Sequence, residues 1–248
     1  MNKITIFNES IINNSNEILT RRDLFEYYQI NKKIKTESTL KNYLLKDLKS
    51  GKIARVGRNK YFFNKKKLLK YNYVYTDKAK NISTKIKQKY PNITFCTFEL
   101  YQLNEFLNHQ VAHNIIFVSV ERNLETYIFE FLKELYPGKV FLNPSSKIVE
   151  QYWSDNMIII KKLISEAPLK KDDSWSARIE KILVDIFTDK IIKNIISFNE
   201  YSKLYEDIFK SYIVDETSMF RYAQRRKAKD KIKNFIIANT NIKLKAVP

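Results

Sequence analysis

The chain has 248 residues, a formal net charge of +18, 44% hydrophobic and 14% aromatic residues, a composition typical of a folded protein with room for two modest domains. Its single cysteine, Cys96, excludes internal disulfides and disfavours a thiolate zinc site, which fits a reducing cytoplasm. No stretch approaches 18 uninterrupted apolar residues and the first residues have no cleavable apolar core, so we expect a cytoplasmic protein that is neither secreted nor membrane-spanning.

The positive charge is concentrated at the two ends of the chain. Residues 1–90 carry 22 Lys and Arg against 7 Asp and Glu, residues 91–220 carry 14 against 19, and residues 221–248 carry 9 against 1. Codon drift in an AT-rich genome explains some lysine excess, but it does not explain the segregation. A basic block beside a mildly acidic body indicates a module that meets a polyanion, and double-stranded DNA is the partner we predict.

Two amphipathic helices are predicted in the basic N-terminal region. The first follows Thr20, which can cap it, and the second opens at Thr36 and ends at Gly51. The apolar positions of the second helix recur at helical spacing: Leu40, Tyr43, Leu44 and Leu48. Two short β segments follow at residues 52–56 and 59–63, joined around Gly57 and Arg58. The order helix, helix, hairpin predicts a winged helix-turn-helix over residues 1–70.

In a winged helix the second helix enters the major groove and the hairpin touches the backbone beside it. We expect Ser38 and Asn42 to meet base edges. The predicted DNA-binding residues are Ser38, Thr39, Lys41, Asn42, Lys46, Arg55, Arg58 and Lys60. The lysines and arginines among them are interpreted as phosphate contacts. The alternative is that these charges form only a solvated face.

The rest of the chain is predicted as a basic linker over residues 71–90 and an α/β domain over residues 91–248. Strands are expected at 93–98, 114–120 and 139–142, a strand or hairpin at 156–165, and helices at 100–108 and 124–135. Three amphipathic helices, at about 176–196, 199–211 and 216–238, end the chain. The fold class predicted is therefore α/β (α+β), with an N-terminal winged helix-turn-helix and a helical C-terminus.

The last helix carries a second basic cluster. A second DNA contact or a partner-docking surface is expected at Arg221, Arg225, Arg226 and Lys227, against the simpler interpretation of a solvated face.

Several catalytic classes are disfavoured by missing residues. With only three glycines, no loop has the spacing that lets backbone amides cradle a phosphate. His109 and His113 on a predicted helix are four residues apart, but no second cluster supplies further metal ligands. The one acid-x-Lys triplet of a restriction-type nuclease begins at Asp47, on the predicted recognition helix. We therefore predict no enzyme activity, no cofactor and no metal.

A nuclease site in the body would require three other carboxylates to converge. Glu121, Asp155 and Glu166 follow or flank predicted strands and are the candidates for such a site.

Several segments taken in order resemble the AbiEi-like type IV toxin-antitoxin antitoxin and transcriptional-regulator family. The segments are residues 103–110, 140–145, 158–169, 179–187 and 221–226, including Asn143-Pro144-Ser145 and Arg225-Arg226. The resemblance implies a bacterial antitoxin whose winged helix represses its own operon and whose C-terminal domain neutralises a nucleotidyltransferase-type toxin. The alternatives are a stand-alone winged-helix transcriptional regulator and a metal-dependent nuclease.

Overall fold

The computed structural model describes residues 18–170 and 175–245, and these residues divide into two units. Of the described residues, the N-terminal unit comprises 18–71, 209–218 and 242–245, and the α/β unit comprises 72–170, 175–208 and 219–241. The predicted domain 91–248 is therefore not continuous, because two of its segments belong to the N-terminal unit.

Threonine caps fix where the two helices of the N-terminal unit begin. At α2 (Arg21–Lys32) the Thr20 hydroxyl accepts the Asp23 N–H at 3.2 Å, and the Asp23 carboxylate accepts the Thr20 N–H at 2.7 Å. At α3 (Glu37–Lys49) the Thr36 hydroxyl accepts the Thr39 N–H at 3.3 Å. Gly51 follows α3 with a φ of 74°, the left-handed conformation that glycine adopts without strain. Both predicted helices are confirmed.

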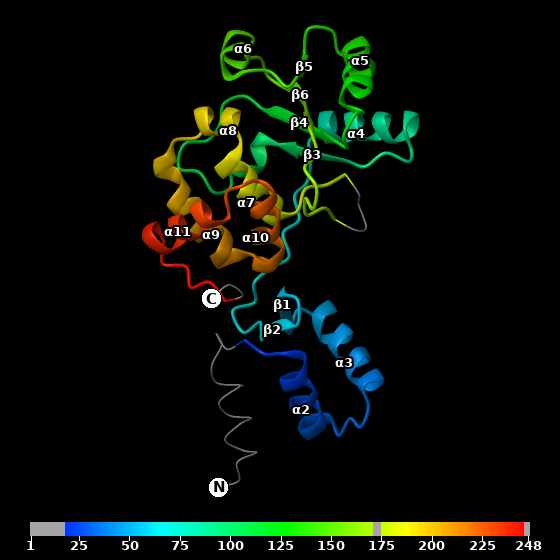
Figure 1. Cartoon of the computed structure of the whole chain (residues 1–248), viewed down its shortest axis with the longest axis vertical. Coiled ribbons are helices and arrows are strands. Elements are labelled where there is room, and N and C mark those ends of the chain that lie inside the picture. Colours follow the sequence, from blue (N-terminus) through cyan, green and yellow to red (C-terminus); the bar gives the residue numbers. More distant parts are fainter. Residues whose placement is uncertain (1–17, 171–174, 246–248) are drawn as a thin grey trace. The chain divides into compact units, whose positions relative to one another are not determined.

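An antiparallel hairpin of β1 (Ile53–Gly57) and β2 (Lys60–Phe63) follows α3 (Figure 1). Leu19 adds a short third pairing on the far side of β2, through reciprocal backbone hydrogen bonds of 2.8 and 2.9 Å with Tyr61. This arrangement of helices and hairpin has the order predicted for a winged helix-turn-helix. The mixed α/β class of the whole chain, with a helical C-terminus, is confirmed as well.

The N-terminal unit has a small core closed by late residues of the chain. Leu24, Leu40 and Ile53 are almost completely buried between the helices and the hairpin. Behind the hairpin, Phe62 packs with Ile213, and Phe62 also lies under the Lys245 ammonium, 4.0 Å from the ring centroid. The Leu69 N–H donates to the Ser211 carbonyl, and the Leu69 carbonyl accepts the Ile213 N–H. The hairpin therefore depends on segments far from it in sequence.

The α/β unit is built on a four-stranded sheet in the order β3-β4-β6-β5. Its strands are β3 (Phe95–Glu99), β4 (Ile115–Val120), β5 (Val140–Leu142) and β6 (Met157–Lys162). β3 is antiparallel to β4, whereas β4, β6 and β5 are parallel. The strands of the predicted alternation are confirmed, and the run at 156–165 is one strand.

Helices α4 (Asp77–Lys89) and α5 (Glu125–Leu135) cover one face of this sheet. Ile82 and Ile86 of α4 are fully buried in the same cluster as Ile116 and Val118 of β4. The prediction of a linker over residues 71–90 is thus wrong. Its lysines lie on the outer side of a helix whose inner side is apolar, and a charge count does not distinguish the two sides.

The remaining segments form short helices, and one of them, over residues 146–151, was not predicted. They are η1 (Leu100–Leu103), α6 (Ser146–Gln151), α7 (Ile179–Thr188), α8 (Lys190–Ile195), η2 (Phe198–Glu200), α9 (Tyr201–Ser211), α10 (Glu216–Arg225) and α11 (Lys229–Asn239). The predicted helix 176–196 breaks at Asp189, which caps α8, and 216–238 breaks near Lys227, where φ is 53°. Within the described ranges, no helix is long and apolar enough to cross a membrane.

We predict that Ile82→Ala lowers the free energy of unfolding of the α/β unit by about 2–5 kcal/mol, because it empties a fully buried site. Both tryptophans, Trp153 and Trp175, lie in this unit, so tryptophan fluorescence during urea unfolding measures it. Lys87→Ala, on the exposed side of α4, is the control and should change it by less than about 0.5 kcal/mol. Equal effects of the two substitutions would show that α4 is not part of the core.

Candidate nucleic-acid interface

The side of α3 opposite its apolar stripe is polar and open. Leu40 and Leu44 are buried at 0% and 4% exposure, and this orientation turns other positions of the same helix to solvent. Four predicted DNA-binding residues are exposed there: Ser38, Lys41, Asn42 and Lys46. The structure thus brings together two side chains able to read base edges and two cations able to bind phosphates.

Two polar residues of α3 have structural partners instead. Thr39 is half-buried, and its hydroxyl lies 2.9 Å from the Thr36 hydroxyl at the start of the helix. Asp47, the acid of the acid-x-Lys triplet, accepts a hydrogen bond from the Tyr28 hydroxyl and lies 3.6 Å from the Lys52 ammonium. Thr39 and Asp47 therefore make contacts that hold α3 in place.

Sequence reasoning missed Leu45, which is 48% exposed on the same outward side of α3 as Lys41, Asn42 and Lys49. An exposed leucine at this position can contact the methyl group of thymine in a major groove. Its spacing was the available signal: Leu45 follows Leu44 and therefore lies off the stripe formed by Leu40, Leu44 and Leu48.

The hairpin adds three cations beside α3, as Arg58 is exposed in its turn, Arg55 is exposed on β1, and Lys60 is half-buried on β2. The Arg55 Nε–H donates to the Gly57 carbonyl at 3.0 Å, which holds its guanidinium along the hairpin. β1 also contacts α3 (Figure 1). Helix and hairpin therefore carry their exposed cations within a single unit.

The nuclease candidates of the body do not converge. Asp155 precedes β6 and accepts the Asn114 N–H at 3.0 Å, at the amino ends of β4 and β6. Glu121 and Glu166 lie at the opposite edge, past a six-residue strand that spans about 20 Å. Among the described residues no three His, Cys, Asp or Glu side chains are grouped to hold a metal ion.

The predicted helix that would have carried His109 and His113 is absent. Residues 100–103 form a 3₁₀ turn, and both histidines follow it in irregular chain. His109 Nδ1 lies 3.1 Å from the Glu200 carboxylate, which also accepts the Asn108 N–H at 2.9 Å. These hydrogen bonds lower the pKa of Glu200. His109 therefore has a structural partner in a loop.

The basic cluster after residue 220 is divided between two settings. Arg221 and Arg225 of α10 are largely exposed, and they flank Glu166, Arg221 at 3.0 Å and Arg225 at 2.7 Å. Lys227 is exposed in the break between α10 and α11. Arg226 is different, because it lies 3.3 Å from the Asp185 carboxylate with only 20% of its side chain exposed. The prediction of Arg226 as a surface contact is thus wrong.

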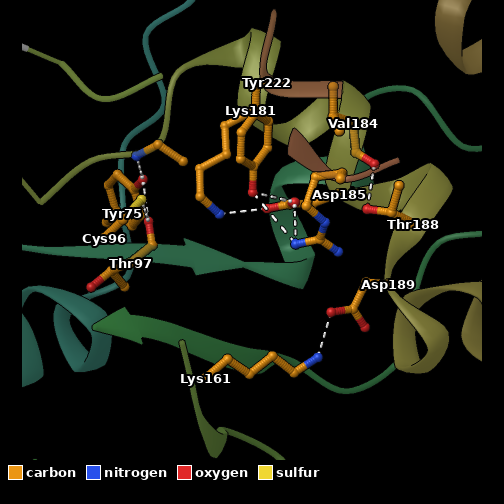
Figure 2. A network of polar contacts seen from close by, with 12 residues as sticks. Tyr75, Cys96, Thr97, Lys161, Lys181, Val184, Asp185, Thr188, Asp189 and Tyr222 are labelled. Carbon is orange, nitrogen blue, oxygen red and sulfur yellow. Dashed lines mark hydrogen bonds and ion pairs between the residues drawn. The ribbon is translucent and has the colours of Figure 1, made fainter. Parts of the chain in front are cut away.

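Asp185 is the centre of a buried network that sequence reasoning did not identify (Figure 2). It pairs with the buried ammonium of Lys181 one turn earlier on α7, and accepts a hydrogen bond of 2.9 Å from the Tyr222 hydroxyl of α10. Nearby, the Lys161 ammonium of β6 pairs with Asp189, the cap of α8. Figure 2 shows Lys181 and Tyr222 pointing toward Asp185, and Lys161 toward Asp189.

The electrostatics of this network favour the charged pair. Burial acts to lower the pKa of Lys181 and to raise that of Asp185. The attraction between them, with Arg226 adding to it at Asp185, outweighs burial, so the pKa of Lys181 lies above its ordinary value and that of Asp185 below. Both groups stay ionised, and α7 is tied to α10.

We predict that Asp185→Asn destabilises the α/β unit by about 3–5 kcal/mol, because it leaves the buried Lys181 ammonium without its carboxylate. Asp207→Asn is the matched control, since Asp207 pairs with Lys203 at the same four-residue spacing but on the surface. It should cost about 1 kcal/mol or less. Urea unfolding followed by tryptophan fluorescence measures both, and similar losses would contradict a buried charge pair.

The same pair sets a pH window. The pKa of Asp185 is lower in the folded state than its ordinary value. Asp185 therefore contributes fully to the free energy of unfolding above its ordinary pKa, and this contribution is lost as the pH falls through the folded-state pKa. The pKa of Lys181 is higher in the folded state than its ordinary value. Lys181 therefore contributes fully to the free energy of unfolding below its ordinary pKa, and this contribution is lost as the pH rises through the folded-state pKa. The stability difference between the native protein and Asp185→Asn should therefore narrow as the pH falls below about pH 4, where Asp185 becomes protonated in the native protein. A difference that grows on acidification would refute this assignment.

Comparison with known proteins adds one finding. The profile described as "Family of unknown function (DUF6577)" matches residues 39–242, which run from α3 through both units to the C-terminal segment. A search of curated proteins found no match. The match covers most of the chain, and the chain belongs to the DUF6577 family.

Proposed function

We propose that this protein is a transcriptional regulator that binds double-stranded DNA through its N-terminal unit. The observation that carries the proposal is the exposed side of α3. Ser38, Lys41, Asn42 and Lys46 lie together on this side, whereas the buried leucines of α3 lie on its other side. A helix of this kind fits the major groove, which is wide enough to admit one α-helix.

In this proposal each residue class has a separate role. The Asn42 amide suits adenine, whose N6 and N7 form a donor and acceptor pair, and Ser38 and Leu45 lie on the same side of α3. Arg55, Arg58 and Lys60 of the hairpin, with Lys41 and Lys46, bind phosphates and fix the position on the duplex. The operator is the promoter of the protein's own gene, and the binding takes place in the cytoplasm.

Salt dependence tests the phosphate contacts. Five contacts give an expected slope of about −4 to −5 for log affinity against log salt. Arg58→Glu should weaken binding to all duplexes and flatten that slope by about one unit. The measurement is fluorescence anisotropy with a labelled duplex from upstream of the gene, and Lys133→Glu, an exposed reversal on α5, is the control. A complex whose affinity does not change with salt would overturn the proposal.

Asn42→Ala tests base readout on the same duplex. We expect it to lose about 1–3 kcal/mol of discrimination between the operator and a scrambled duplex, with an unchanged salt slope. Competition anisotropy with the two duplexes gives this difference directly. If Asn42→Ala weakens both duplexes equally, α3 does not read bases.

The antitoxin role implied by the resemblance stays a prediction, as does the nucleotidyltransferase-type toxin as partner. Growth of cells expressing the adjacent reading frame, with and without this chain from a separate promoter, tests it. The variant used is full-length Arg58→Glu rather than a truncated chain, because residues 209–218 pack in the N-terminal unit and would lose their partners if residues 1–70 were removed. If the native chain and the variant both relieve toxicity, neutralisation of the toxin does not require DNA binding. If expression of the adjacent reading frame is not toxic, the antitoxin prediction fails and the proposal of a stand-alone regulator stands.

A further inference from the structure

A pocket of about 540 Å³ lies at the carboxyl ends of β4 and β6 in the α/β unit. It is lined by Thr94, Glu121 and Arg122, by residues 162–167 and by Leu169. Val120, the last residue of β4, pairs in register with Lys162, the last residue of β6. The pocket therefore opens where ligands bind in open α/β sheets, outside the carboxyl ends of parallel strands. Its volume is in the range of small-molecule sites.

The described lining of this pocket carries charged side chains, and their pairing decides which ligand it suits. Arg122 and Lys162 are exposed on its wall, and the guanidinium groups of Arg221 and Arg225 stand against Glu166, which is also part of the wall. The described lining holds two cations, Arg122 and Lys162, and two carboxylates, Glu121 and Glu166. Arg221 and Arg225, which are not lining residues, already neutralise Glu166, so among the described lining residues only Glu121 opposes Arg122 and Lys162. An anionic ligand is favoured over a cation.

The contacts of Glu166 strengthen this choice. Its Oε2 forms an ion pair with Arg221 Nε at 3.0 Å and its Oε1 accepts hydrogen bonds from Arg225, the shorter at 2.7 Å, so both oxygens contact guanidinium groups. A divalent cation that used Glu166 would have to break these contacts and approach two arginines. The pair Glu121 and Glu166 is thus unsuited to a metal site.

We propose that this pocket binds a phosphorylated small molecule of about nucleotide size. Arg122, in the turn after β4, and Lys162, the last residue of β6, bind the phosphate oxygens, and the hydroxyls of Thr94 and Ser165 are hydrogen-bond donors in the same pocket lining. Leu163, Ile164 and Leu169 give an apolar surface for the rest of the ligand. The phosphate is held by side chains, so no glycine-rich loop is needed.

Isothermal titration calorimetry of the full chain with pyrophosphate, adenosine 5′-monophosphate, adenosine and succinate tests the proposal. Both phosphate compounds should bind, and the monophosphate should bind at least tenfold more tightly than adenosine. Arg122→Glu and Lys162→Glu should each weaken the phosphate compounds at least tenfold, whereas Lys133→Glu on α5 should stay within twofold. Glu166→Gln, which removes a negative charge, should tighten them several-fold.

Three results would overturn the proposal: no binding of either phosphate compound at millimolar concentration, equal affinity in the native and charge-reversed proteins, or succinate binding as tightly as pyrophosphate. The thermal unfolding midpoint of each variant, measured in parallel without ligand, shows that the α/β unit is folded. The pocket lies within the α/β unit, so these results do not depend on DNA binding, and either proposal can fail without the other.

Discussion

The buried carboxylate of Asp185 is the constraint on which the helical part of the α/β unit depends. It lies between the Lys181 ammonium of its own helix, the Tyr222 hydroxyl of α10 and the Arg226 guanidinium that follows α10. Taking such a charge out of water is favourable only when its partners are fixed around it. The spacing between α7 and α10 is therefore set by charge as well as by apolar packing. Through Lys161 and Asp189 the junction of α7 and α8 is also tied to β6.

This network separates the basic residues of the chain by role. Lys181 and Arg226 neutralise a carboxylate inside the unit, and Arg221 and Arg225 share Glu166 at the wall of a pocket. On α3, by contrast, Lys41, Asn42 and Lys46 are exposed, and Arg58 is exposed in the turn of the hairpin that follows. Free positive charge on a helix of groove-fitting size supports the DNA proposal, whereas internally paired charge at the end of the chain does not.

The N-terminal unit is not a simple N-terminal piece of the chain. Ile213 packs behind the hairpin, Lys245 covers the ring of Phe62, and the Lys245 N–H donates to the Glu216 carboxylate at 2.7 Å. Residues of the C-terminal third thus complete the surface that supports β1 and β2. A change in residues 209–218 or 242–245 would reach the hairpin through these contacts, which gives the C-terminal region a physical route to the proposed DNA surface.

Local patterns in the sequence determined much of this protein. Thr20 and Thr36 as caps, the stripe of Leu40 and Leu44, and Gly51 after α3 were sufficient to predict the helices and hairpin, because caps and helical periodicity are properties of neighbouring residues. The strands of the α/β unit were predictable for the same reason, since each is a short apolar run between turns.

The tertiary structure decided what depends on partners distant in sequence. The lysines of α4 predicted a linker, although Ile82 and Ile86 on its other side enter the core. Arg226 had the sequence signature of a surface cation, and only the approach of Asp185, 41 residues earlier, makes it internal. The pocket between Arg122 and Lys162 likewise exists because β4 and β6, separated by a helix, a strand and another helix, become neighbours in the sheet. Burial, charge pairing and strand order are properties of the assembled chain, and no local pattern contains them.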